Sequence, residues 1–274
     1  MSSVHLQSNP RNQNARMLSD LYISGLRLDR QRLGETEDRY FLSIPAIQNL
    51  EELDFHSRIT FFVGENGTGK STLLEAIAVK YGFNPEGGSP NFSFSTKETH
   101  SHLHQCLVLS KGIRRPQNGF FLRAESFYNV ASEVDRLAEA APGGEGFLEG
   151  YGGHLHEKSH GESFLALVMN RFNGKGLYIL DEPEAALSPS RQMSLLKLLY
   201  DLSAQGAQFI IATHSPILMV LPGAELYALE QHAIRLVSYE ETEHYVVMRQ
   251  FLNHPDGMLR ELGIEPKQVS RNNQ

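Results

Sequence analysis

A glycine-rich stretch follows an apolar run in FFVGENGTGKST, residues 61–72. Its spacing, a glycine, four residues and then Gly-Lys-Ser, is that of a loop whose backbone N–H groups cradle phosphates. Glycine is needed there because side chains would block the phosphates and because the loop uses positive φ angles. The Lys70 charge would face the β- and γ-phosphates of ATP, and the Ser71 hydroxyl could ligate Mg²⁺. The predicted nucleotide-binding residues of this loop are Gly64, Glu65, Asn66, Gly67, Thr68, Gly69, Lys70, Ser71 and Thr72.

Two adjacent carboxylates follow a second apolar run in GLYILDEPEAALS, residues 176–188. Taken alone, they could simply cap a strand at the surface. In a chain with a phosphate loop, Asp181 is placed to hold Mg²⁺ through water, and Glu182 to orient or deprotonate the attacking water. Phosphoryl transfer needs little covalent help, so positioning and charge neutralisation account for most of the rate. Glu184 is expected to have a structural or dimer-contact role.

A histidine follows a third apolar run in AQFIIATHSP, residues 207–216. Ligands of open parallel sheets bind outside the carboxyl ends of the strands, so His214 is expected near Lys70 and Asp181. From there its imidazole could hydrogen-bond the γ-phosphate or the attacking water. The predicted catalytic residues are therefore Lys70, Glu182 and His214, and the predicted metal ligands are Ser71 and Asp181.

A polar segment opens a helical pattern in KSHGESFLALV, residues 158–168. Ser159 fits an N-cap, and Glu162 fits the first helical turn. A helix N-terminus also presents unpaired N–H groups and a partial positive charge to anions. The same segment can therefore be a helix cap and a phosphate site.

The elements that must position these residues can be read from periodicity. Strands are expected in DLYISGLRL, RYFLSIP, RITFFV, GFFLRAESF, GLYIL and AQFIIAT, with a terminal hairpin of LYALE and AIRLVSYE. Helices are expected at about 70–79, in SEVDRLAEAA, at about 162–172 and in SRQMSLLKLLYDLSAQG, and residues 82–119 are expected to be rich in loops. Alternating strands and helices predict an α/β fold with a mostly parallel central sheet covered on both faces.

Composition limits the class of protein. The chain has 274 residues, 41% hydrophobic residues and a net charge of −7, which fits a globular protein that is not basic overall. One cysteine, Cys106, cannot form an intramolecular disulfide and suggests a reducing, cytoplasmic location. The polar start at residues 1–17 lacks the apolar core of a signal peptide, and no apolar run is long enough to insert into a membrane.

With these residues in order, the chain resembles the ATP-binding-cassette (ABC) class of P-loop ATPases. The DEPEAALSP and ATHSP forms are similar to its soluble branch, which includes the RecF recombination mediator, SMC-type heads, overcoming-lysogenization-defect ATPases and small predicted AAA-type ATPases. The resemblance implies an N-terminal β subdomain, a helical lid and a head-to-tail homodimer that closes on ATP and Mg²⁺. In such a dimer Ser159, Gly161 and Glu162 would bind the γ-phosphate held by the other subunit.

The implied domain organisation is a flexible tail at 1–17, an ATPase domain at 18–252 with its lid at about 120–170, and a C-terminal helix and tail at 253–274. The gap between the phosphate loop and Ser159 is too short for a long coiled-coil arm. Gln105 and Gln117 are candidates for the glutamine with which the class senses Mg²⁺ and water, but neither is assigned. Tyr40 is a weak candidate for stacking on adenine.

The process driven by ATP is left open. A switch or motor acting with nucleic acid in DNA repair or defence is preferred, and the ATP-binding subunit of a membrane transporter or a switch on an effector protein are the alternatives. The basic cluster KGIRRP, with Lys111, Arg114 and Arg115, is either a solvated loop or a contact to a phosphate backbone. Arg123 and Glu125 face either the nucleotide or the lid. Alternating histidines could bind Zn²⁺ but lack supporting ligands; they are His100, His102, His104, His154, His156 and His160.

Overall fold

The computed structural model describes residues 19–34, 40–89, 101–140 and 144–265. In these ranges the strands form two sheets, one of six strands in the order β5-β6-β7-β3-β8-β9 and one of three in the order β2-β1-β4. The six-stranded main sheet consists of β3 (Ile59–Val63), β5 (Asn118–Arg123), β6 (Gly176–Asp181), β7 (Gln208–Ala212), β8 (Glu225–Leu229) and β9 (Ile234–Val237). Its strands are mutually parallel except β9, which forms an antiparallel hairpin with β8.

The smaller sheet is the expected N-terminal β subdomain. Its central strand β1 (Ile23–Leu28) pairs antiparallel with β2 (Glu52–Asp54) and β4 (Leu107–Lys111). The short helices α1 (Pro45–Gln48) and α3 (Leu103–Cys106) lie in the connections around this sheet.

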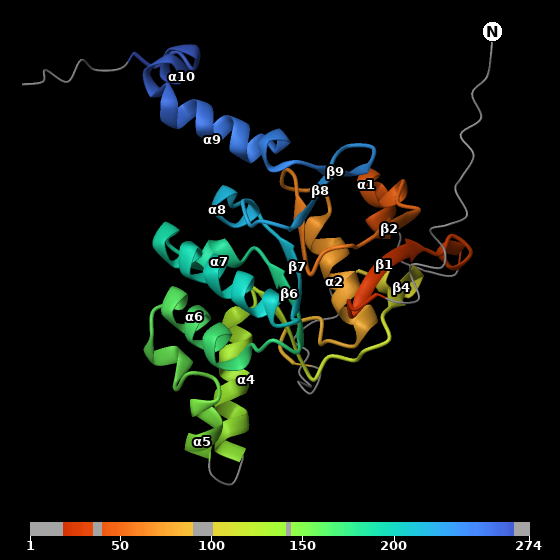
Figure 1. Cartoon of the computed structure of the whole chain (residues 1–274), viewed down its shortest axis with the longest axis vertical. Helices are drawn as coiled ribbons and strands as arrows, with labels where there is room; N and C mark the ends of the chain where they lie inside the picture. The colour runs from red at the N-terminus through yellow and green to blue at the C-terminus, as the bar shows by residue number, and fades with distance from the viewer. Residues whose placement is uncertain (1–18, 35–39, 90–100, 141–143, 266–274) are drawn as a thin grey trace, which may run out of the picture.

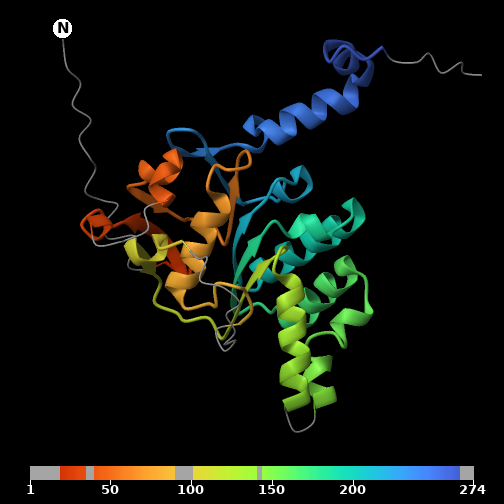
Figure 2. The same ribbon diagram turned by 180° about the vertical axis from the view of Figure 1, so that it is seen from behind.

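Helices cover both faces of the main sheet (Figures 1 and 2). They are α2 (Lys70–Tyr81), α4 (Phe127–Ala140), α6 (His160–Arg171), α7 (Pro189–Ala204) and α8 (Pro216–Met219), and α5 (Gly144–Glu149) packs against α4. The helices α9 (Glu243–Asn253) and α10 (Pro255–Glu261) project away from the sheet, as Figure 1 shows.

Two adjacent residues of β3 show why both faces are covered. Phe61 belongs to the apolar core formed with α4, α6 and α7, whereas Phe62 belongs to the core formed with α2 and the small sheet. Alternate side chains of a strand point to opposite faces, and both rings are fully buried. A fully buried phenylalanine contributes about 1.5–3 kcal/mol, so each face of the sheet is a stabilised core.

The parallel strands define two edges of the main sheet. We call the edge where β3, β5, β6 and β7 end the carboxyl edge, and the edge where they begin the amino edge. The helices of the lid region, α4 to α6, begin after Arg123, because β5 still belongs to the main sheet. The expected boundary at residues 252 and 253 falls at the end of α9. The predicted tail at 1–17 lies outside the described residues.

Two expectations about local structure were wrong. RYFLSIP is not a strand but a 3-10 turn at Tyr40–Ser43 followed by α1, in which Pro45 occupies the first helical turn. Proline suits that position because its missing N–H has no helical partner there. Residues 82–119 are also less irregular than expected, because they contain α3, β4 and the start of β5. The lid helix α6 starts at His160, directly after the expected N-cap Ser159.

None of the helices in the described ranges is both long and apolar enough to cross a bilayer.

Candidate nucleotide site

The phosphate loop connects β3 to α2 at the carboxyl edge. Gly64, Gly67 and Gly69 have φ angles of 138°, 80° and 96°, all in the region that favours glycine. A Cβ atom on Gly64 would lie 2.6 Å from the carbonyl oxygen of Leu229, and one on Gly69 would lie 2.7 Å from Ile44. The loop therefore depends on glycine at these positions, both for its backbone angles and for its packing.

Lys70 is held inside this loop. Its side chain is buried, and its Nζ donates hydrogen bonds of 2.8 Å to the carbonyl oxygens of Gly64 and Glu65. Burial lowers the pKa of Lys70, and the carboxylates of Glu182 and Asp181 act in the opposite direction. The carbonyl oxygens thus fix the ammonium group inside the loop that an incoming phosphate would enter.

Ser71 and Asp181 meet at the expected metal position. The Ser71 hydroxyl donates a 3.0 Å hydrogen bond to Oδ1 of Asp181, the last residue of β6. Burial raises the pKa of Asp181 to about 6, while the nearby Arg123 lowers it. A hydroxyl and a buried carboxylate side by side are hard oxygen donors of the kind Mg²⁺ prefers, and a cation would offset the cost of the buried charge. The residues present fit a magnesium ion.

Glu182 has an unusual backbone conformation. Its φ of 51° and ψ of 51° make it the one non-glycine residue with a positive φ among the described residues. Such a residue costs of order 1–3 kcal/mol and persists only where surrounding contacts impose it. Its Oε1 lies 3.4 Å from Nε2 of His214, so the strained turn directs the carboxylate toward the histidine.

His214 follows β7 and is held from two sides. Its backbone N–H donates to Oε1 of Glu184, and its Nδ1 lies 2.9 Å from Nε2 of His244 on α9. Burial and the Lys70 charge lower the pKa of His214, which favours the neutral ring. If Nε2 of His214 carries the proton and faces Glu182, then Nδ1 of His214 accepts the hydrogen bond that Nε2 of His244 donates. The contact of Glu184 with the His214 backbone fits the structural role expected of that residue.

Arg123 lies in the site rather than against the lid. Its Nη1 donates to Oε2 of Glu75 at 2.7 Å, and its Nε lies 3.5 Å from Oδ2 of Asp181. Sequence alone left its direction open. The deciding fact is the pairing of β5 with β6, which sets Arg123 directly beside Asp181 as the last residues of two parallel strands. His244 was missed entirely, because no local pattern relates α9 to the residue after β7.

The start of α6 is an N-cap with additional contacts. Oε2 of Glu162 accepts from the backbone N–H of Ser159 at 3.1 Å and from its hydroxyl at 2.7 Å, and Arg191 contacts the other oxygen at 2.9 Å. These bonds lower the pKa of Glu162. A Cβ atom on Gly161 would lie 2.5 Å from the Ala186 carbonyl oxygen, so glycine allows this helix to pack closely.

Two cavities border the site. One, of about 140 Å³, is lined by Tyr40, Ile44, Asn66, Gly67, Gly69, Lys70, Ser71, Thr72 and Glu182. The other, of about 210 Å³, is lined by Ser71, Arg123, Ala124, Glu125, His160, Asp181, Glu182 and Ala185. Among the described residues lining these two cavities, the start of α6 contributes His160, whose ring stacks on Phe127. Tyr40 reaches the phosphate loop, whereas Gln105 lies in α3 and Gln117 lines a different cavity.

The structure therefore brings together the phosphate loop, Asp181, Glu182 and His214 as the sequence predicted. Ser159 and Glu162 are exposed and border neither cavity among the residues described. No group of three or more potential metal ligands is present in the described parts of the chain. His102 and His104 lie at a helix rather than on a strand, His154 and His156 lie near Asp135, and His100 is outside the described residues.

Comparisons of the sequence with known proteins point to ATPase domains. Residues 163–220 match the family model "AAA domain, putative AbiEii toxin, Type IV TA system", and residues 39–111 match a second AAA domain model. A petrobactin import ATP-binding protein of Bacillus anthracis is 26% identical over 66% of this chain and 71% of its own length. A macrolide export ATP-binding/permease protein of Marinobacter nauticus is 24% identical over 64% of this chain and 29% of its own.

A ribose import ATP-binding protein of a Chelativorans strain is 28% identical, and the match covers 65% of this chain and 37% of that protein. The chain thus spans about a third of the length of two of these three relatives. Among solved structures, cbiO1 of Clostridium perfringens, part of the ABC transporter complex cbiONQ, gives a TM-score of 0.47 at 17% identity over 88% of this chain and 99% of that one. An SMC head domain of Thermotoga maritima gives a TM-score of 0.38 at 19% identity. That match covers 68% of this chain and 92% of the other.

The sheet, the phosphate loop, the carboxylates after β6 and these sequence matches support an ABC-class P-loop ATPase.

Proposed function

We propose that this chain hydrolyses ATP at the carboxyl edge of its main sheet. The observation that carries the proposal is the convergence of Lys70, the Ser71–Asp181 pair and Glu182 on one loop. Lys70 and the loop N–H groups bind the phosphates. Glu182 orients or deprotonates the attacking water, and His214, 3.4 Å from it, hydrogen-bonds the γ-phosphate or that water.

Ser71 and Asp181 would hold Mg²⁺, which when bound neutralises charge on the β- and γ-phosphate oxygens. Arg123 keeps Asp181 ionised and in place by its contact at 3.5 Å. Each aligned group of this kind is typically worth about 3 kcal/mol, or a factor of roughly a hundred in rate.

We further propose that two copies close head to tail on two ATP molecules. Ser159 and Glu162 are exposed at the start of α6, where Arg191 neutralises the Glu162 carboxylate. The N-terminus of a helix attracts anions, and Ser159 and Glu162 line neither of the two described cavities at the nucleotide site of their own chain. The γ-phosphate held by a second copy is a suitable ligand for it.

Light scattering after size-exclusion chromatography tests this closure. Glu182→Gln should bind ATP without hydrolysing it and should run at twice the monomer mass only with ATP and Mg²⁺. Ser159→Arg in the same background should stay monomeric while still binding ATP. Ser203→Arg, at the far end of α7, is the matched control and should dimerise. A dimer of the Ser159 variant equal to that of the control would rule out the role of α6.

The process served by this cycle is proposed to be a nucleic-acid-related one, in defence or repair. The AbiEii toxin description of the family model over residues 163–220 supports defence. Import and export ATP-binding proteins among the relatives support a second candidate, an energising subunit of a membrane transporter. Purification of the Glu182→Gln protein with ATP distinguishes the two candidates. In a nucleic-acid-related process, nucleic acid or an effector protein should co-purify with it. In a transporter, a polytopic membrane protein should co-purify.

A further inference from the structure

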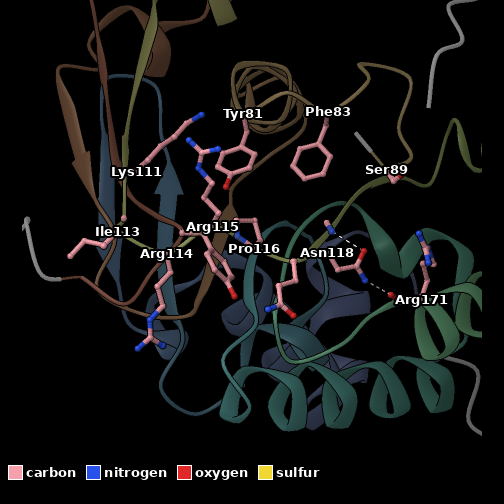
Figure 3. Close-up of a pocket in the computed structure, with 14 residues that line it drawn as sticks. Tyr81, Phe83, Ser89, Lys111, Ile113, Arg114, Arg115, Pro116, Asn118 and Arg171 are labelled. Atoms are coloured by element: carbon pink, nitrogen blue, oxygen red, sulfur yellow. Dashed lines mark hydrogen bonds between the residues drawn. The ribbon is translucent and has the colours of Figure 1, made fainter. Parts of the chain in front are cut away.

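A cavity of about 730 Å³ lies at the amino edge, away from the phosphate loop. Its walls come from the end of α2, the turn after β4, the start of β5 and the last residue of α6, as Figure 3 shows. The lining residues are Tyr22, Tyr81, Phe83, Ser89, Lys111, Gly112, Ile113, Arg114, Arg115, Pro116, Gln117, Asn118, Gly119 and Arg171. Its size is that of sites that enclose organic ligands, which span about 300–1,000 Å³.

The charges of this pocket are all positive. Four of its lining side chains are cationic, and no carboxylate is among the described residues that line it. Within the described residues, Lys111 and Arg115 have no ion pair, whereas the Arg171 guanidinium lies 4.8 Å from the centre of the Tyr151 ring. The pair of Arg114 with Asp20 is long, at 3.8 Å, between side chains exposed by 74% and 68%. Such an exposed pair stabilises little. In a chain of net charge −7, this local concentration of positive charge is suited to an anion.

Aromatic rings lie among these cations. Tyr81 and Phe83 stack with centroids 5.8 Å apart, and the Lys111 Nζ lies 4.5 Å from the Tyr81 ring centre. Figure 3 shows Arg115 extending beside the same ring, and its charge acts to lower the pKa of Tyr81, which burial raises. The side-chain amide of the exposed Gln117 is on the rim and can donate and accept hydrogen bonds. Cations beside aromatic faces are the combination that binds phosphates together with bases.

We propose that this pocket binds single-stranded nucleic acid, with phosphates on Lys111 and Arg115 and a base against the Tyr81 ring. The inference deepens the nucleic-acid-related role proposed above and rests on it for its biological setting. A single strand is favoured over a duplex because only an unpaired base can leave its neighbours and reach a ring. A free nucleotide carries the same chemistry, and the experiment separates the two.

Two rigid elements join this pocket to the nucleotide site. The helix α2 begins at Lys70 in the phosphate loop and ends at Tyr81 in the pocket, about 17 Å away at 1.5 Å per residue. The strand β5 begins at Asn118 in the pocket and ends at Arg123 beside Asp181. A single-stranded nucleic acid bound at the amino edge would therefore contact α2 and β5, the same elements that position the phosphates and the metal ligand.

Fluorescence anisotropy with a labelled oligo-dT of about 20 nucleotides tests the proposal on the full chain, since sites for single strands span about 4–16 nucleotides. The pocket variant is Lys111→Glu with Arg115→Glu. The control, Lys197→Glu with Arg249→Glu on α7 and α9, changes the net charge equally. We expect the pocket variant to weaken binding at least tenfold and the control less than twofold. Losing two phosphate contacts should also reduce the salt slope by about 1.4, since each contributes about 0.7.

A third variant, Tyr81→Leu, keeps every charge and should weaken oligo-dT binding severalfold, by loss of stacking. ATP binding by each variant shows that it is folded. Equal losses in the pocket variant and the control, or no loss in the pocket variant, would overturn the proposal. Displacement of the oligonucleotide by AMP at equal concentration would also overturn the proposal, because the pocket would then be a mononucleotide site. A duplex that binds as tightly as the single strand would overturn it as well.

The Glu182→Gln protein should bind the oligonucleotide as tightly as the unaltered chain. Absence of ATP hydrolysis in a chain that binds oligo-dT through the pocket would contradict the proposed ATPase mechanism alone. Hydrolysis that depends on Glu182 in a chain that does not bind oligo-dT would contradict the pocket proposal alone.

Discussion

The two edges of the main sheet carry charge in opposite ways. At the carboxyl edge two cations are held within the chain, Lys70 by loop carbonyls and Arg123 by Glu75 and Asp181. At the amino edge Lys111 and Arg115 border an open cavity with no ion pair among the described residues. Both edges are built by the same elements, α2 and β5, which run from one to the other.

The nucleotide site at the carboxyl edge is preorganised, whereas the pocket at the amino edge has cations, Lys111 and Arg115, that no anion of the described residues pairs with. Paired groups at the carboxyl edge hold fixed positions before a ligand arrives, which phosphoryl transfer needs because its rate depends on alignment. Unpaired cations at the amino edge repel one another until an anion arrives, which suits reversible binding to a flexible polyanion. The following three substitutions test this difference, in order of decreasing expected effect.

Arg123→Gln tests whether the carboxyl-edge charges stabilise one another. Removing this arginine leaves Glu75 and Asp181 buried without their cation, and breaking a buried pair typically costs about 3–5 kcal/mol. We expect a loss of that order in the free energy of unfolding, measured by urea denaturation. Arg235→Gln is the control, because the exposed pair of Arg235 with Glu230 should contribute less than about 1 kcal/mol. Equal losses would show that the carboxyl edge is no more tightly coupled than the surface.

Asp181→Asn tests whether the buried, ionised carboxylate of Asp181 lowers the free energy of unfolding. Burial raises the pKa of Asp181 to about 6, above its ordinary value of 3.8, so its ionised form is disfavoured by folding. The resulting loss of stability is absent below pH 3.8, grows as the pH rises to about 6 and is complete above it. Without Mg²⁺, the asparagine variant should be more stable at pH 8 by about 1–3 kcal/mol.

Denaturation of the Asp181→Asn variant and the unaltered chain at pH 8 and at pH 5 checks this sign. The advantage of the variant should be smaller at pH 5, and Mg²⁺ with ATP should stabilise only the unaltered chain. A variant that is less stable at pH 8 would mean that Asp181 stabilises the fold through Arg123 and Ser71 more than its burial destabilises it.

His244→Phe tests whether the C-terminal helix α9 is part of the carboxyl edge. Loss of the 2.9 Å contact frees the His214 ring, so we expect kcat for ATP to fall about tenfold while KM changes little. His244→Gln, whose amide can still donate, should recover much of the rate. His232→Phe, at an exposed position, is the control. An equal fall in kcat for the glutamine and phenylalanine variants would assign His244 a packing role only.

The sequence predicted those parts of the site that depend on local geometry. The phosphate loop is one continuous segment, and Asp181, Glu182 and His214 follow apolar strands whose ends meet in any parallel sheet. Arg123 could not be placed without knowing that β5 lies next to β6. The contact between His214 and His244 depends on where α9 packs, which periodicity does not report.

The errors have the same origin. RYFLSIP has residues typical of strands, but Phe41 and the residues around Pro45 bury themselves as short helical turns against the phosphate loop and the small sheet. The basic cluster KGIRRP has two interpretations, and its neighbourhood in the folded chain supports the phosphate contact that we propose. Tyr81, Phe83 and Arg171 come from two distant helical segments, and only the folded chain brings them to Lys111 and Arg115.

Phosphate release from ATP by the purified chain, measured beside Glu182→Gln under saturating ATP and Mg²⁺, tests the central claim most directly. We predict steady turnover by the unaltered chain and a fall of at least about a hundredfold in the variant, with ATP binding retained. Equal phosphate release from the two proteins would contradict the account, because the strained carboxylate after β6 would then have no part in activating water.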